Sequence, residues 1–410
     1  MIARSPNVAG PLLAVVVAAL TSTQALAQPA PAGAAAESPV SPAVQALRRA
    51  MLDKDVSTLT FRSMDQLFTT RTVPHAGPAW NMPRADRALD FTYSFKGVSY
   101  TPEQFLDRTY TNALLIIKDG RIVSEIYRNN MTAGTRHMGW SMTKSITSIL
   151  VGCALAEGRI KSLDDQVTAY LPELRGGGYD GVTVRQVLQM RSGVDYEERY
   201  DFENPGIAAR NHEAALVRNV ARFADAARTV KRAHKPGEVF QYKTIDTAVL
   251  GWMLERVSGG SNLAAYATQR LWEPLGAEAD GFFIMDGPPG VGREFNGAGF
   301  NAVLRDYGRI GLMMLNGGRA NDRQILSREW VTESTRPAAA EGPEGGYGYQ
   351  WWTMPGSDAY AAIGLQGQFI FIDPATKTVV VKLSHFPPGD VEADPESRAF
   401  FAAVSAWPAR

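Results

Sequence analysis

The chain has 410 residues, of which 45% are hydrophobic and 20% are charged, a composition typical of a folded globular protein. Forty-two basic and 42 acidic residues give a formal net charge of zero. This balance argues against a dedicated nucleic-acid-binding protein, because such proteins carry a basic surplus. The single cysteine, Cys153, excludes an intrachain disulfide and a zinc site built from several cysteines.

The first 27 residues have the pattern of a cleavable export signal. Arg4 supplies the positive charge, residues 12–20 form a short apolar run, and residues 25–27 read Ala-Leu-Ala, which is typical of a cleavage site. The run is short for a membrane span, and a retained anchor is the alternative interpretation. Residues 28–42 are rich in alanine and proline, so we expect a disordered spacer there. We therefore predict a periplasmic or secreted protein with no membrane contact after signal cleavage.

Two predicted β-hairpins lie near opposite ends of the mature chain. Residues 114–118 and 121–127 flank an Asp-Gly pair, which is a strong hairpin signal. Residues 368–372 and 378–383 form a second pair around a longer turn, and a helix is expected at 396–406. Hairpins at both ends predict an α/β fold, in which an antiparallel sheet is flanked by helices and carries an inserted, mostly helical region. The site is expected between these parts.

The segment between the hairpins is predicted to be mostly helical. Its helix candidates are 142–157, 183–190, 213–227, 244–258, 261–271, 301–316 and 327–334. We expect one domain over residues 43–410, with its sheet part at about 90–160 and 300–410 and its helical part at about 161–299.

The chemistry is expected at the start of the predicted helix 142–157, which is apolar on all sides and therefore buried. Ser141 and Lys144 are one helical turn apart, so their side chains share a face. A serine hydroxyl needs a base to become a nucleophile, and a lysine can be that base when burial and the helix dipole lower its pKa. The amide of Ser141 would be an oxyanion donor. A capping serine and a lysine reaching the surface would give the same spacing, so the spacing alone does not decide.

Further segments, in the same order along the chain, resemble the serine β-lactamase and penicillin-recognising superfamily. They are WSMTKS (140–145), EGRIKSLDDQVTAYLPEL (157–174), VTVRQVLQMRSGVDYEERYDF (182–202), KPGEVFQYKTIDTAVLGWMLERVSG (235–259), GAGFNAVLRDYGRIGLMMLNGGR (297–319) and GLQGQFIFIDPATKTVVV (364–381). The chain most resembles the class C β-lactamase-related esterases and, within them, the aminohexanoate-dimer (nylon-oligomer) hydrolases. The resemblance covers about 105–385 and implies the β-lactamase/penicillin-binding-protein fold and serine hydrolase activity.

The resemblance adds a tyrosine to the expected catalytic group. The Tyr-x-Asn motif of the family reads Tyr242-Lys243-Thr244 here. The phenol of Tyr242 is expected beside the nucleophile, partly ionised by the nearby lysine and able to carry the serine proton to the leaving group. Packing at the start of the following helix is its alternative role. Thr244 replaces the asparagine, which weakens the case for β-lactam recognition.

The strand motif that reads Lys-Thr-Gly or His-x-Gly in the family is Leu365-Gln366-Gly367 here. The resemblance implies that Gly367 lets the substrate lie against the strand and that the amide of Gln368 is the second oxyanion donor, with that of Ser141. Leu365 would contact the substrate in place of a cation, which removes a contact of roughly 1.5–3 kcal/mol to a substrate carboxylate. Ester or amide hydrolysis is therefore ranked above β-lactam hydrolysis.

Two aromatic positions are assigned to substrate binding. Tyr196, in the SGVDY run, resembles a substrate-contacting tyrosine of the nylon-oligomer subgroup, with surface packing as its alternative. Trp351 and Trp352 follow a glycine-rich stretch. Trp351 is assigned to the cleft, although at least one of the two is expected to pack under the final hairpin.

The sequence predicts an acyl-enzyme serine hydrolase acting on small esters, amides or linear oligoamides, as a monomer or homodimer, with neither a metal nor an organic cofactor. A β-lactamase or D-alanyl-D-alanine carboxypeptidase is the second interpretation. A non-catalytic penicillin-binding-like protein is the third, because a scaffold does not fix a function. The lysine base leaves His137 with a loop or supporting role, while His385 is expected to be structural or to face the cleft.

Overall fold

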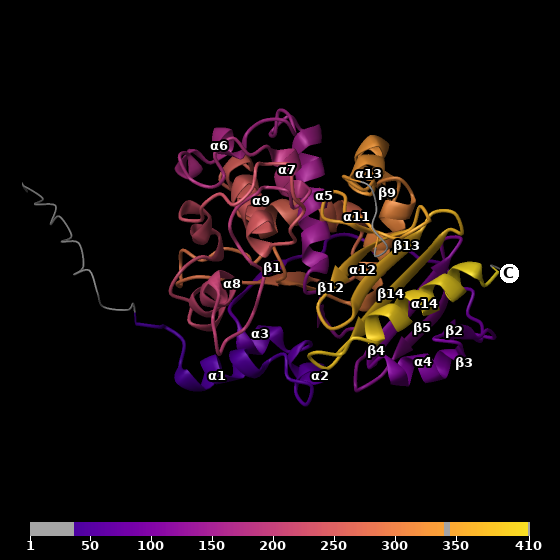
Figure 1. Cartoon of the computed structure of the whole chain (residues 1–410). Helices are drawn as coiled ribbons and strands as arrows, with labels where there is room; N and C mark the ends of the chain where they lie inside the picture. The colour runs from indigo at the N-terminus through magenta and orange to yellow at the C-terminus, as the bar shows by residue number, and fades with distance from the viewer. Residues whose placement is uncertain (1–36, 340–344, 409–410) are drawn as a thin grey trace, which may run out of the picture. The chain divides into compact units, whose positions relative to one another are not determined.

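The computed structural model describes residues 37–339 and 345–408 (Figure 1). The predicted export signal and the first part of the predicted spacer lie outside the described residues. From Ser38 onward the chain forms one compact unit, and Ser38 Oγ donates a hydrogen bond to the carbonyl of Arg218 (2.6 Å). Ser41 then caps the helix α1 (Pro42–Ala50). The spacer prediction is therefore wrong for its last residues, because they are tied to the folded unit.

The main sheet has six strands, and every neighbouring pair is antiparallel. In spatial order they are β11 (Trp352–Thr353), β12 (Tyr360–Gly364), β13 (Gln368–Asp373), β14 (Thr378–Ser384), β4 (Thr111–Lys118) and β5 (Arg121–Tyr127). The pairing of β14 with β4 joins the two predicted hairpins into one sheet. Both hairpins and the predicted fold class are confirmed.

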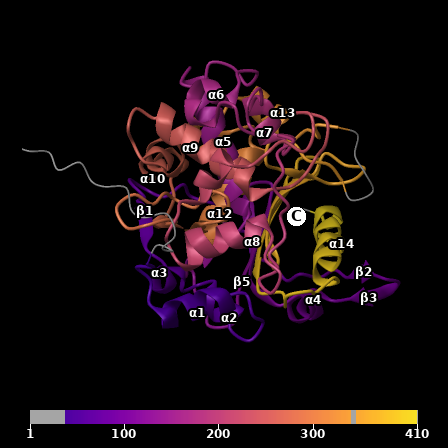
Figure 2. The same ribbon diagram turned by 60° about the vertical axis from the view of Figure 1, so that its left-hand side comes forward.

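Helices cover both faces of this sheet, so its central strands are buried along their whole length (Figure 2). These helices are α12 (Leu304–Leu315) on one face and α4 (Pro102–Arg108) and α14 (Ala393–Ala406) on the other. In β4, Leu115 and Ile117 belong to the core on the α12 side, whereas Leu114 and Ile116 belong to the core under α14. Alternate residues of a strand point to opposite faces, which explains why this hairpin is apolar at successive positions.

Two long buried helices, α5 (Met142–Ala156) and α9 (Thr244–Val257), pack against each other beside the sheet. Nearly all of α5 is buried, as its uniformly apolar sequence predicts. Ser141 and Lys144 lie at the start of α5, and Tyr242 lies just before α9. The packing of the two helices therefore brings the two sequence motifs together.

A second antiparallel sheet of four short strands is not predicted from the sequence. In spatial order its strands are β1 (Thr70–Val73), β7 (Gly281–Ile284), β8 (Phe300–Ala302) and β6 (His137–Met138). Strands of two to four residues are too short to show a period of two. β7 lies inside the predicted helical part 161–299, so that region is not helical throughout. β6 ends just before Ser141 and fixes the path of the chain into the site.

Most predicted helices are present, with ends shifted by a few residues, but the single helix predicted at 213–227 is wrong. That segment forms a π-turn, η2 (Glu213–Val217), and a 3-10 turn, η3 (Phe223–Arg228), separated by Asn219 with a φ of 50°. The remaining elements are α2 (Ser57–Thr60), α3 (Met64–Leu67), β2 (Tyr93–Phe95), β3 (Val98–Tyr100), α6 (Val167–Tyr170), η1 (Pro172–Leu174), α7 (Val184–Leu188), α8 (Ile207–His212), α10 (Leu263–Ala267), η4 (Thr268–Trp272), α11 (Glu273–Leu275), β9 (Arg319–Ala320), β10 (Arg323–Gln324) and α13 (Arg328–Ser334). None of the described helices has the length and hydropathy needed to cross a bilayer.

Candidate active site

Ser141 begins α5, and its hydroxyl is free of helix capping. The side chain makes no capping hydrogen bond, so the capping interpretation does not hold. Trp140, just before it, has a φ of 47°, a strained conformation for a bulky residue that is typical of functional sites. Gly139 allows the close turn, since a Cβ there would lie 2.6 Å from the Tyr307 hydroxyl. This turn places Ser141 in the wall of a cavity.

Lys144 is 1% exposed and makes three hydrogen bonds. Its Nζ donates to Ser141 Oγ (2.9 Å), Thr244 Oγ1 (3.1 Å) and the carbonyl of Gly297 (2.8 Å). A Cβ on Gly297 would lie 2.4 Å from the Thr244 side chain, so a glycine lets this carbonyl approach. Burial lowers the pKa of the Lys144 amine to about 8, and the Glu198 carboxylate opposes this shift. The lysine therefore does not reach the surface, and part of it is an uncharged base near neutral pH.

Tyr242 lies beside both residues. Lys144 Nζ is 4.9 Å from the centre of its ring, and the ring stacks on Trp352 at 5.4 Å. Desolvation raises the pKa of the phenol, and a hydrogen bond with Ser141 opposes the rise. The predicted partial ionisation is therefore wrong, because the loss of water around the hydroxyl outweighs its polar partners. Tyr242 is a neutral phenol that can donate a proton.

Thr244 connects this centre to a carboxylate that the sequence did not indicate. Its Oγ1 accepts from Lys144 and donates to Glu198 Oε1 (2.6 Å), and its amide donates to Glu198 Oε2 (2.8 Å). The hydroxyl of Tyr200 also donates to Glu198 (2.6 Å). Thr244 thus uses its hydroxyl to bridge the lysine and the carboxylate. Glu198 and Tyr200 lie in the EERY run, inside a segment whose resemblance to the family is visible in the sequence. That resemblance indicates the segment but gives these two residues no role.

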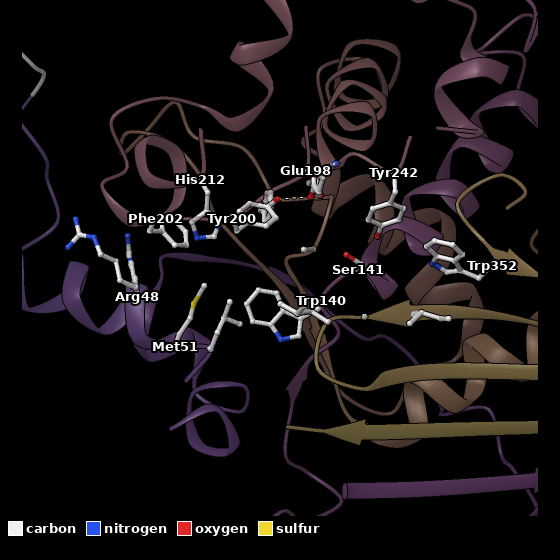
Figure 3. A pocket seen from close by; sticks show the side chains of 18 of the residues that line it. Arg48, Met51, Trp140, Ser141, Glu198, Tyr200, Phe202, His212, Tyr242 and Trp352 are labelled. Atoms are coloured by element: carbon white, nitrogen blue, oxygen red, sulfur yellow. Dashed lines mark hydrogen bonds between the residues drawn. The ribbon is translucent and has the colours of Figure 1, made fainter. Parts of the chain in front are cut away.

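These groups open into a cavity of about 420 Å³ (Figure 3), a size that suits a small-molecule substrate. Ser141, Tyr242 and Thr244 line it. Its wall is otherwise mostly apolar or aromatic, with a few charged groups, and it includes Arg48, Arg49, Met51, Leu52, Trp140, Glu198, Tyr200, Phe202, His212, Phe295, Ala298, Trp352, Ile363, Gly364, Leu365 and Arg398.

The two aromatic residues assigned to substrate binding lie elsewhere. Tyr196 is 2% exposed, and its hydroxyl accepts a hydrogen bond from a buried asparagine side chain. Tyr200, four residues later, lines the cavity instead. Trp351 is fully buried, whereas Trp352 lines the cavity and stacks on Tyr242. Neighbouring residues in extended chain point in opposite directions, so one tryptophan of the pair faces the cavity and the other faces the core.

The strand motif is placed only partly as predicted. Leu365 lines the cavity and is 49% exposed, as expected of a substrate contact. Gln368 is fully buried in β13 and pairs with Gly364 of β12, so the second amide donor is not there. Gly367 has a φ of 90° and packs on the Phe386 ring, 2.4 Å from where a Cβ would lie. The motif forms the turn between β12 and β13, which brings Gly364 and Leu365 to the cavity in place of Gly367 and Gln368.

The two singled-out histidines stand outside the cavity wall. His137 is fully buried, its ring nitrogens are 3.0 Å from the carbonyl of Met138 and 3.3 Å from the amide of Asn112, and burial lowers its pKa to about 4. Burial also lowers the pKa of His385 to about 4. Both are neutral at pH 7. Within 37–339 and 345–408, no group of three or more metal-ligating side chains comes together.

Comparisons with known proteins identify the family of the chain. A family model described as Beta-lactamase matches residues 103–403, most of the chain. The chain belongs to the beta-lactamase family. It is 35% identical over 312 residues to the 6-aminohexanoate-dimer hydrolase of Paenarthrobacter ureafaciens, a match that covers 72% of this chain and 76% of that protein. The family resemblance found in the motifs is confirmed.

Solved structures show the same fold. A candidate 6-aminohexanoate-dimer hydrolase from Bacillus anthracis superposes with a TM-score of 0.77 at 24% identity, over 87% of this chain and 95% of that chain. A family VIII carboxylesterase has a TM-score of 0.57 at 18% identity, over 74% and 94% of the two chains. These structures show the shared fold, and the family model and the curated relative make this beta-lactamase-family protein a serine hydrolase.

Proposed function

We propose that this serine hydrolase cleaves ester or amide bonds of small substrates through an acyl-enzyme on Ser141. The observation that carries the proposal is the 2.9 Å contact between Lys144 Nζ and Ser141 Oγ, in a site where burial lowers the pKa of the amine to about 8. Near neutral pH, the unprotonated fraction of that amine can take the serine proton.

Acylation begins when Ser141 Oγ gives its proton to Lys144 Nζ and bonds to the substrate carbonyl carbon. The amides of Ser141 and Leu365 hold the resulting oxyanion, with Leu365 in the role first assigned to Gln368 because it lies in the cavity wall with the serine. The intermediate then collapses. The leaving group departs with the proton of the Tyr242 hydroxyl, and the proton on Lys144 replaces it.

Deacylation uses the same groups on a water molecule. Water loses a proton to the Tyr242 and Lys144 pair and attacks the acyl carbon. The bond to Ser141 Oγ then breaks, and the serine regains its proton as the product acid leaves. The neutral phenol of Tyr242 suits this exchange, because a group with a raised pKa holds its proton until a stronger base forms nearby.

The relative named 6-aminohexanoate-dimer hydrolase makes a linear aminohexanoate oligoamide one substrate to test.

We also propose export, on the basis of the signal pattern in residues 1–27. Sequencing the N-terminus of the protein recovered from the medium or periplasm tests this point. The expected first residue is Gln28, and an unprocessed Met1 would contradict it.

A substrate panel tests the proposed reaction. Wild type and Ser141→Ala are compared on 4-nitrophenyl butyrate, the linear aminohexanoate dimer, a D-Ala-D-Ala peptide and nitrocefin. We expect turnover of the ester or the oligoamide, and none by Ser141→Ala. Turnover that survives the substitution would contradict the proposal, and cleavage of the peptide or nitrocefin alone would assign a cell-wall or β-lactam activity instead.

A further inference from the structure

The end of the cavity away from Tyr242 and Trp352 lies where the helix α1 and the residues that follow it meet the segment around Phe202 and His212. Figure 3 shows Arg48 and Met51 at this end, together with Phe202 and His212. No sequence motif falls in α1, and the mechanism above gives it no task. We call this region, formed by Arg48, Met51, Phe202 and His212, the outer end of the cavity, and we count with it Leu52, which follows Met51 in the chain and also lines the cavity.

Arg48 is 5% exposed, its guanidinium lies over the Phe68 ring at 4.3 Å, and its hydrogen-bond acceptors are all neutral. Its Nε donates to the carbonyl of Leu67, and its Nη1 donates to the carbonyls of Leu216 and Val217 and to the Asn219 side chain. Among the described residues, no carboxylate lies within 4.0 Å of its guanidinium, and its Nη2 makes no hydrogen bond. A buried cation is normally matched by an anion. Burial lowers the pKa of Arg48 to about 10, which leaves it charged at neutral pH.

The neighbouring charges do not supply that anion. Glu213 is already paired with Arg49, with a distance of 3.1 Å between Oε2 and Nε. Burial lowers the pKa of His212 to about 4, so its ring is neutral at pH 7. Glu198 is occupied by Thr244 and Tyr200 nearer the serine. The outer end therefore carries a positive charge, on Arg48, that has no carboxylate partner in the part of the chain that the structure describes.

Figure 3 places Trp140 and Met51 between Ser141 and Arg48, so this part of the wall is apolar. We propose that the outer end binds the carboxylate end group of a substrate whose apolar chain runs along this wall to the scissile carbonyl. The carboxylate accepts hydrogen bonds from Nη2 of Arg48. This inference rests on the proposed function and names the class of substrate that the site prefers.

Two ester series test it. The acyl series holds 4-nitrophenyl esters whose six-carbon acyl chain ends in methyl, carboxylate or ammonium. The leaving-group series holds butyrate esters of six-carbon alcohols with the same three ends. In one series we expect wild type to favour carboxylate over methyl in kcat/KM by about tenfold or more, the effect of one charge-assisted hydrogen bond, and to disfavour ammonium. No carboxylate preference in either series, with neutral esters still cleaved through Ser141, would overturn the inference and leave the proposed function intact.

Variants assign the preference to one residue. Arg48→Gln should abolish the carboxylate preference, and Arg48→Lys should keep part of it. The preference is the ratio of kcat/KM for the carboxylate ester to kcat/KM for the methyl ester of the same variant, so a general loss of activity cancels. Arg398→Gln is the matched control, because this cavity-lining cation is already paired with Asp394 (2.8 Å), and its preference should equal that of wild type. If Arg48→Gln fails to fold, Leu52→Asp places a competing carboxylate at the same end and should remove the preference. A preference unchanged in Arg48→Gln or Leu52→Asp would overturn the inference, as would an equal loss in Arg398→Gln.

Discussion

The two ends of the cavity are built in different ways. At the reaction centre, Lys144 makes three hydrogen bonds to groups from α5, the start of α9 and the segment before β8. At the outer end, the helix α1 brings Arg48 into the wall, where no carboxylate within residues 37–339 and 345–408 pairs with its guanidinium. The contrast suggests that the chemistry depends on a closed network held by buried helices, whereas substrate choice depends on how α1 docks.

The largest effect is expected at the reaction centre. Lys144→Ala removes the base and should lower kcat/KM by about 10⁴-fold or more for every substrate, because groups that act as a unit lose their function together. Steady-state kinetics with a short and a long ester checks this. A loss confined to the long ester would mean that the lysine acts in substrate binding and would erase the distinction between the two ends.

A somewhat smaller effect is expected for Tyr242→Phe. The ring keeps its stacking on Trp352 while the hydroxyl is lost, so kcat should fall by about 10²–10⁴-fold with the thermal midpoint nearly unchanged. The paired control is Trp352→Phe, which should change KM more than kcat. A Tyr242→Phe enzyme with native kcat would show that the leaving group takes its proton elsewhere.

The next effect is a change in pH dependence. Lys144 must be unprotonated to act, so wild-type kcat/KM should rise with pH through a midpoint of about 8. The Glu198 carboxylate favours the protonated amine. Glu198→Gln should therefore lower the pKa of Lys144 and move the rising limb of kcat/KM to lower pH. The rate at high pH should fall less than in Lys144→Ala or Tyr242→Phe. A limb that stays in place or moves to higher pH would contradict this effect of Glu198 on the pKa of Lys144.

The smallest effect is expected at the outer end. Leu52→Ala trims a half-buried apolar contact, worth on the order of 1 kcal/mol, and should raise KM for a long-chain ester several-fold. The acetate ester, which does not reach this end, should be hydrolysed at the wild-type rate. Comparable losses for both esters would show that α1 supports the reaction centre as well.

The reaction centre could be predicted because its signals are local. Ser141 and Lys144 share a helical face by spacing alone, and Tyr242 follows from a short motif at the start of the next helix. Both hairpins were readable from turn residues between two β-rich runs. Arg48 could not be found this way, because it reaches the cavity through contacts with residues 168 and 169 positions away.

The misassignments of Gln368 and of Trp351 have a common cause, which is that the sequence does not show toward which side of the chain each residue points. Gln366 and Gly367 both have positive φ, 57° and 90°, so the strand motif turns where an extended strand was assumed, and Gln368 enters the core. Trp351 and Trp352 differ by one position, which decides which of them faces the core. The packing of the sheet decides which of these residues face the core and which face the cavity, and a short run of sequence does not show this.

The most direct test of the central claim is peptide mapping by mass spectrometry after reaction with a fluorophosphonate probe across a pH series. The account predicts a single adduct, on Ser141, that forms faster as pH rises through about 8 and is nearly absent in Lys144→Ala. An adduct on a different residue, or equal labelling of Ser141 in Lys144→Ala, would contradict it.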